Sequence, residues 1–233
     1  MNRFFLFLFF VFVSIGLSAQ DDDYMSGNLR FGIKAGINSS SMQFYNNLPD
    51  ADLSTTSKFG YYLGGNMHIP LSKNFIPIVE LGFENLRSEV AYKKTYSPDA
   101  VSEHFAGDIS LNYLSLGICP NFTFDISHIK LNIYGGFHLS FPLSTKEDGT
   151  YKKLLKDEQS GNFTTVSTKV SGSNKYLTEG IDSGLLTGFG LEYKLMEKIS
   201  LHFDSRFRFG TVLIANSFKS RSWGFSAGVV YDL

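Results

Sequence analysis

A repeated two-residue alternation of apolar and polar side chains constrains this chain more than any other feature. The clearest example ends the sequence, where Trp223, Phe225, Ala227, Val229 and Tyr231 alternate with mostly small or polar residues. Successive side chains of a β-strand point to opposite faces, so each such stretch presents one apolar and one polar face. Stretches of about 9–11 residues with this pattern are typical of strands that span an outer membrane as part of a closed barrel.

Eight stretches follow this pattern, so the sequence predicts eight strands. The expected strands are 28–38, 58–69, 75–86, 109–122, 131–141, 183–195, 199–210 and 222–233. Pro77 suggests that the third strand begins late or carries a bulge, because proline has no N–H to donate to a sheet. The apolar phase of the fourth strand changes at Tyr113 and Leu114, which predicts a second bulge.

The connections between these strands alternate in length. Short turns are expected at 70–74, 123–129 and 196–198, and long polar loops at 39–57, 87–108 and 143–182. In outer-membrane barrels short turns face the periplasm and longer loops face outward. The sequence therefore predicts an all-β fold over 28–233: an eight-stranded antiparallel up-and-down transmembrane β-barrel in the bacterial outer membrane, with both termini periplasmic and the long loops extracellular.

The first residues have the features of a secretion signal. Arg3 precedes an apolar run over 4–13, and small residues then lead to an expected cleavage after Ala19. This gives a signal peptide over 1–19 and a short periplasmic segment over 20–27. The apolar run is short for a helical membrane anchor, which is the competing interpretation.

Composition excludes several classes of function. The formal net charge of −1 argues against a nucleic-acid-binding protein, which needs a basic face. Cys119 is the one cysteine, and no cysteine or histidine cluster has zinc-site spacing, so we expect no disulfide, metal or cofactor.

A secreted soluble barrel of the lipocalin type would also need a signal peptide and eight antiparallel strands, with its apolar face inward. Two features favour the inverted arrangement. The polar face is rich in glycine, as at Gly32, Gly64 and Gly188, which suits a narrow interior. The apolar face carries bulky aromatic residues near strand ends, as expected for the aromatic girdles of a membrane barrel.

Charged side chains recur on the face that is then inside the barrel. An eight-stranded barrel is just wide enough for its own side chains, and buried charges must be paired. We therefore expect an ion-pair network that fills the lumen, with a selective ion-lined passage as the alternative. The inward charges are Arg30, Lys34, Glu80, Glu84, Glu192, Lys194, Asp204, Arg206, Arg208 and Asp232.

Several strand sequences are similar to a known family. The segments 31–38 (FGIKAGIN), 77–83 (PIVELGF), 112–118 (NYLSLGI), 133–137 (IYGGF) and 206–216 (RFRFGTVLIAN) resemble the PorT-like outer-membrane β-barrel family of Bacteroidetes-type bacteria. The resemblance covers nearly the whole mature chain and brings no catalytic or ligand-binding signature. It implies, as one role, participation in protein export of the type IX kind.

The C-terminus departs from the usual pattern of such barrels, which end in an aromatic residue that the barrel-assembly machinery recognises. Here Leu233 is last, and Tyr231 lies two positions before it. We interpret these two residues as a weakened assembly signal, with the assembly machinery and outer-membrane lipid as expected partners.

Three functional hypotheses follow. The first is a non-enzymatic structural or interaction scaffold that binds through its long external loops. The second is an accessory component of a secretion or transport assembly. The third is a lipid-modifying enzyme at the rim, for which Ser102, Glu103 and His104 are the candidate group. Adjacent residues in a loop rarely make the nucleophile, base and orienting geometry of an active site, so no catalytic residue is assigned.

Overall fold

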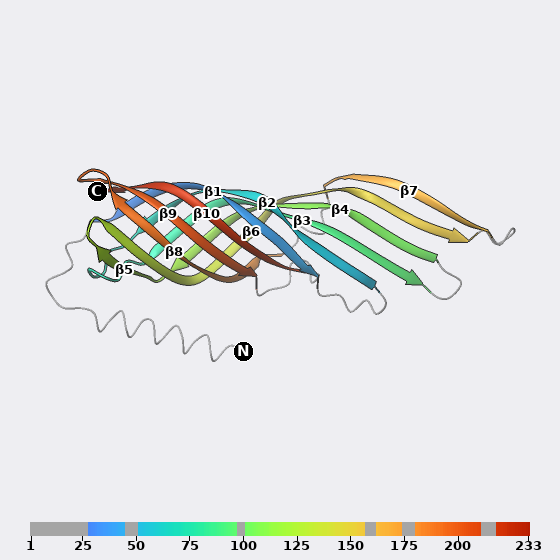
Figure 1. Ribbon diagram of the computed structural model, residues 1–233, viewed down its shortest axis with the longest axis horizontal. Helices are drawn as coiled ribbons and strands as arrows, with labels where there is room; N and C mark the ends of the chain where they lie inside the picture. The colour runs from blue at the N-terminus through green and yellow to red at the C-terminus, as the bar shows by residue number, and fades with distance from the viewer. Residues whose placement is uncertain (1–27, 45–50, 97–100, 157–161, 174–179, 211–217) are drawn as a thin grey trace, which may run out of the picture.

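The computed structural model describes residues 28–44, 51–96, 101–156, 162–173, 180–210 and 218–233 (Figure 1). The expected signal peptide, 1–19, and the segment 20–27 lie outside the described residues. No described helix is long and apolar enough to cross a membrane. The strands are β1 (Arg30–Phe44), β2 (Ala51–His68), β3 (Ile78–Tyr96), β4 (Val101–Cys119), β5 (Asn121–Ile126), β6 (Ile129–Lys156), β7 (Phe163–Gly172), β8 (Asp182–Lys194), β9 (Ile199–Gly210) and β10 (Phe218–Asp232).

Eight of these strands close into an antiparallel ring. Their order is β4-β3-β2-β1-β10-β9-β8-β6, and a further pairing of β4 with β6 completes the circle. The predicted eight-stranded up-and-down barrel is therefore confirmed. The remaining two strands are additions: β5 continues β4 beyond Pro120, where the ladder lacks an N–H donor, and β7 pairs with the far end of β6.

The short connections gather at one end of the barrel, which we call the turn end; Arg30 and Asp232 lie there as paired residues. β5 and β6 are joined by a two-residue turn in which Ser127 has a φ of 58°. The turn between β8 and β9 is closed by a hydrogen bond from the Leu195 N–H to the Ile199 carbonyl. β3 begins at Ile78, directly after Pro77, as predicted.

The opposite end, which we call the extended end, corrects the prediction of long loops. Much of 39–57, 87–108 and 143–182 is β-strand: β3 and β4 pair as far as Tyr96 and Val101, and β6 continues to Lys156 before β7 returns along it. These segments, together with 51–57 of β2, form an extended sheet that projects past the rest of the ring (Figure 1). The prediction was wrong because it identified strands by alternate apolar residues on the outer face. A sheet beyond the lipid-facing wall does not need apolar residues on that face.

The predicted bulge in the fourth strand is also corrected. Odd-numbered residues of β4 face inward along its length, including buried Ile109, Leu111 and Tyr113. The register shift lies in the partner strand, where Tyr113 pairs with Pro142 and Asn112 pairs with Ser144. The apolar phase of β4 therefore changes sides without any change in the direction of its side chains.

The outer wall of the ring is a continuous band of exposed hydrophobic side chains, which we call the apolar belt. Ile33 is 73 % exposed and Phe59 is 72 % exposed, values that a water-soluble barrel would avoid on so large a surface. The belt includes Phe31, Ile33, Ile37, Phe59, Leu63, Leu81, Leu114, Ile118, Ile133, Phe137, Phe141, Phe189, Leu191, Phe203, Phe225 and Tyr231. Its position on the outside favours lipid as the surrounding medium over the lipocalin-like arrangement.

Candidate functional site

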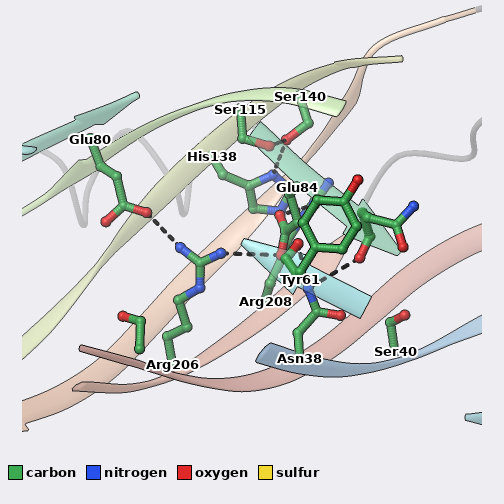
Figure 2. A network of polar contacts seen from close by, with 12 residues as sticks. Asn38, Ser40, Tyr61, Glu80, Glu84, Ser115, His138, Ser140, Arg206 and Arg208 are labelled. Carbon is green, nitrogen blue, oxygen red and sulfur yellow. Dashed lines mark hydrogen bonds and ion pairs between the residues drawn. The ribbon is translucent and has the colours of Figure 1, made fainter. Parts of the chain in front are cut away.

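The interior of the ring contains a chain of alternating positive and negative side chains, which we call the lumen network. Lys34, on β1, places its Nζ 2.8 Å from Asp204 Oδ2 and 2.6 Å from Glu80 Oε2. Arg206, on β9, donates to Glu80 Oε1 at 2.6 Å and to Glu84 Oε1 at 3.2 Å (Figure 2). Because these groups come from β1, β3 and β9, the network connects opposite walls of the barrel.

Toward the extended end, Arg208 continues the network by donating to Glu84 Oε2 at 2.6 Å and to Asp182 Oδ2. The Ser220 hydroxyl donates to the same Asp182 oxygen at 2.6 Å. Asp182 is not among the predicted inward charges, because it is the last residue of the segment 143–182, which was expected to be a loop. It precedes the predicted strand 183–195 by one residue, and that alternation, extended backward, would have placed it inside.

At the turn end, Arg30 pairs with Glu192 and Asp232. Lys194 is exposed, and it lines a pocket of about 140 Å³ at the turn end together with Glu192 and Asp232. Lys194 therefore lies at the mouth of the lumen beside two network acids, and its participation in the network stays a prediction. β8 reaches the end of the ladder at this residue, so its side chain reaches solvent at the rim.

Aromatic rings and glycines complete the packing of the lumen. The Arg206 guanidinium carbon lies 3.6 Å from the centre of the Tyr62 ring. A Cβ atom added to Gly64 would lie 2.1 Å from the nearest Tyr62 atom, and one added to Gly82 would lie 2.4 Å from it. The glycines of the inner face thus give the Tyr62 ring room to lie against the wall beneath the guanidinium, a cation–π arrangement.

Little space remains between these side chains. A cavity lined by Lys34, Glu80, Tyr134 and Asp204, among others, has a volume of about 10 Å³, which is room for about one water molecule. Among the described residues, no group of three or more histidine, cysteine or acidic side chains is placed to hold a metal ion. The lumen in this structure is a packed interior.

Beyond the lumen network, toward the extended end, the inner face becomes apolar. We call this region the inner apolar cluster: Met42, Leu86, Val90, Phe105, Ile109, Leu111 and Tyr113. Partly buried Tyr92 and Tyr151 pack against it, and the Tyr92 and Phe105 rings stack with their centres 5.7 Å apart. The extended sheet therefore has an apolar inner face, while its outer face carries residues such as Lys93 and Asp148.

The histidine considered for rim catalysis lies in this sheet. Glu103 and His104 are consecutive residues of β4, so their side chains point to opposite faces. Glu103 pairs with Lys153 at 3.3 Å, whereas His104 lies across from Lys93 and Lys152. This arrangement does not bring the glutamate and the histidine together as an acid–base pair.

The two residues interpreted as an assembly signal lie at the turn end. Tyr231 faces outward at 43 % exposure, and Leu233 is exposed with its N–H donating to the Leu29 carbonyl. Both are accessible on the outer wall at the seam where the first and last strands of the ring pair.

Comparison with known proteins agrees with this architecture. The chain matches the family described as "Outer membrane protein beta-barrel domain" over residues 18–213. Curated proteins give no match.

Solved structures of outer-membrane and surface proteins resemble the fold at low sequence identity. OprG from Pseudomonas aeruginosa is 13 % identical with a TM-score of 0.47, over 89 % of this chain and 97 % of OprG. Neisserial surface protein A is 16 % identical with a TM-score of 0.41, over 87 % and 97 %. Ail, the attachment invasion locus protein of Yersinia pestis, is 13 % identical with a TM-score of 0.39, over 89 % and 100 %. Because the family match covers most of the sequence, this chain belongs to the outer membrane protein β-barrel domain family and is a protein of the bacterial outer membrane.

Proposed function

We propose that this protein is a non-enzymatic outer-membrane barrel that acts as a structural or interaction scaffold. Its lumen is closed by side chains, and its extended sheet is the contact surface outside the cell. In this orientation both termini and the turn end are periplasmic. The observation that carries the proposal is the division of the chain into a packed, ion-paired ring and a sheet that continues well past the apolar belt.

The lumen supports a scaffold better than a passage. Each arginine of the central network contacts two carboxylates. Glu80 and Glu84 lie on β3, across the ring from the arginines of β9, whereas Asp182 lies on the neighbouring strand β8. Breaking one such buried pair leaves an uncompensated charge, which costs about 3–5 kcal/mol. Opening a continuous path would require several of these pairs to separate together.

The extended sheet supports recognition of another macromolecule. β7 is exposed along nearly its whole length and, among the described strands, pairs with β6 alone. A strand with one unpaired edge is a template for main-chain pairing with another polypeptide. The contact surface is therefore an ordered sheet rather than the set of long loops expected from the sequence.

Conductance tests the closed lumen. Full-length protein reconstituted in planar bilayers should give no ion-sized current steps. The double variant Glu80→Ala/Arg206→Ala removes one cation and one anion and should conduct, because it opens space without leaving a net charge. The control Glu89→Ala/Arg87→Ala makes the same change on the outer wall. Steady conductance by the unaltered protein would favour the ion-lined passage.

Crosslinking in intact cells tests the contact surface. A photoreactive residue replacing Thr168, on β7, should capture a partner outside the membrane, whereas the same residue replacing Leu63, on the apolar belt, should contact lipid. Capture of membrane subunits from Leu63 and of nothing from Thr168 would instead favour the accessory component of a secretion assembly. External protease cleavage at the 70–74 turn would contradict the proposed orientation.

A further inference from the structure

The outer wall carries a row of cations just beyond the apolar belt. Lys58 on β2 pairs with Arg87 on β3, Arg87 pairs with Ser110 on β4, and Ser110 pairs with Lys146 on β6. These four residues are therefore direct cross-strand neighbours on one face of four adjacent strands. We call Lys58, Arg87 and Lys146 the basic row.

The side chains on either side of this row have a definite order. Toward the turn end comes a ladder of neutral polar groups, in which Asn85 Nδ2 donates to Asn112 Oδ1 at 2.7 Å and Asn112 Nδ2 donates to Ser144 Oγ at 2.8 Å. Beyond that ladder lie apolar-belt residues such as Leu114 and Phe141. On β2 the change is abrupt, because Lys58 directly precedes Phe59 and the register of β2 against β3 shifts between Lys58 and Tyr62.

Toward the extended end, the next row is acidic. Glu89 pairs with Asp108, and Asp108 pairs with Asp148, so three carboxylates lie side by side. Asp108 Oδ1 lies 2.6 Å from Lys58 Nζ, and Asp108 Oδ2 lies 3.6 Å from Arg87 Nη2. The hydrogen bond to Asp108 raises the pKa of Lys58 above its ordinary value, so this lysine is charged at neutral pH.

This order has a physical cost that needs an explanation. Like charges directly opposite each other destabilise a sheet, and Lys58 and Arg87 are direct cross-strand neighbours. Asp108 offsets part of that repulsion from one side, as does Glu89, whose Oε2 lies 3.4 Å from Lys58 Nζ. The other side of the row faces the belt, where the side chains are neutral or apolar, so an anion at that level would be attracted by all three cations.

The apolar belt indicates which molecules surround the basic row. Lipid acyl chains cover the belt, and the headgroups of the same lipids then lie at its edge, at the level of the asparagine ladder and the basic row. Basic residues at this level attract anionic headgroups, each contributing to retention. We propose that the basic row, with Ser110, is a binding site for the phosphate groups of a phosphorylated lipid in the leaflet at the extended end.

A matched pair of double variants tests this site. Arg87→Gln/Lys146→Gln removes two cations of the basic row from β3 and β6. The control Lys93→Gln/Lys152→Gln removes two cations from the same strands and the same face, farther from the belt. Full-length protein in detergent is given a bisphosphorylated glycolipid or its phosphate-free form, and retained lipid is counted by native mass spectrometry.

The unaltered protein should retain the bisphosphorylated lipid, and the basic-row variant should lose retention on the order of tenfold. The control should retain it as the unaltered protein does. Equal retention of the phosphate-free lipid, or equal loss in the control, would overturn the proposal. Displacement by inorganic phosphate at the same concentration would identify a free-anion site instead. Heat-dependent gel migration confirms that each variant is folded.

Discussion

The same strands obey opposite rules in two parts of the molecule. Within the ring, β4 directs Leu114 and Ile118 outward and Ser115 and Gly117 inward. Toward the extended end it directs Phe105, Ile109 and Leu111 inward and Asp108 and Ser110 outward. The side-chain directions do not change, so the residue types have exchanged faces. The surrounding medium explains the exchange, because apolar side chains of the ring contact lipid, whereas those toward the extended end pack against each other.

The two interiors are consequently built from different interactions. The ring is filled with charges that hold one another across the lumen, whereas the extended sheet is held by the inner apolar cluster. A buried ion pair tolerates the loss of a partner poorly, since the remaining charge cannot reach water. An apolar cluster responds to truncation in proportion to the cavity that is left.

The largest effect is expected from Arg208→Met, which leaves Asp182 without its cation and Glu84 with one arginine. We expect the free energy of unfolding to fall by about 3–5 kcal/mol, measured by urea titration in lipid vesicles. Arg221→Met, an exposed position on β10, serves as the control and should change it by about 0.5 kcal/mol or less. Equal effects of the two substitutions would mean that the lumen is wet enough to solvate Asp182.

A second prediction concerns the outer face of one strand on the two sides of the boundary. Ile118→Arg places a cation on the lipid-facing wall and should cost about 2–4 kcal/mol. Ala106→Arg makes the same addition on the same face of β4 in the extended sheet, where the cost should be about 0.5 kcal/mol or less. Urea titration in vesicles measures both. Similar penalties at the two positions would show that lipid reaches as far as Ala106 and would move the boundary.

The boundary between the ring and the extended sheet also separates the features that the sequence predicts from those that it does not. Inside the ring the alternation predicted which residues face inward, as for Asp204, Arg206 and Arg208 on β9. It could not predict which acid each cation meets, because Arg206 and Glu80 lie on strands that only barrel closure brings together. In the extended sheet, a segment such as 163–172 is rich in serine and threonine on both faces, so no apolar phase marks it as a strand.

The change at Tyr113 is the most instructive error. A shift of apolar phase within a strand has two possible causes: an extra residue that rotates the chain, or a change in the surrounding medium. The bulge predicted at Tyr113 corresponds to the first cause alone. The structure retains the phase of β4 and places the irregularity in β6, near Pro142, so the apolar shift in β4 reports the change of medium.

A third prediction tests the inner apolar cluster. Leu111→Ala should lower the stability of the extended end by about 2–3 kcal/mol, because Leu111 is fully buried in the inner apolar cluster and its truncation leaves a cavity there. The loss should be local. Amide hydrogen exchange should accelerate in the outer parts of β3, β4 and β6 while β8 and β9 retain their protection. Uniform acceleration across the ring would mean that the two parts unfold as one unit.

The smallest effect on stability is expected from Arg87→Met. Arg87 is half exposed and lies 3.6 Å from Asp108, so the pair should contribute about 0–1 kcal/mol and less at high salt. A loss comparable to that of Arg208→Met would place Arg87 in the structural interior. The contrast matters because the same residue is expected to affect lipid retention strongly. Arg87 would then have its main role in binding lipid phosphate, whereas Arg208 has its main role in stabilising the fold.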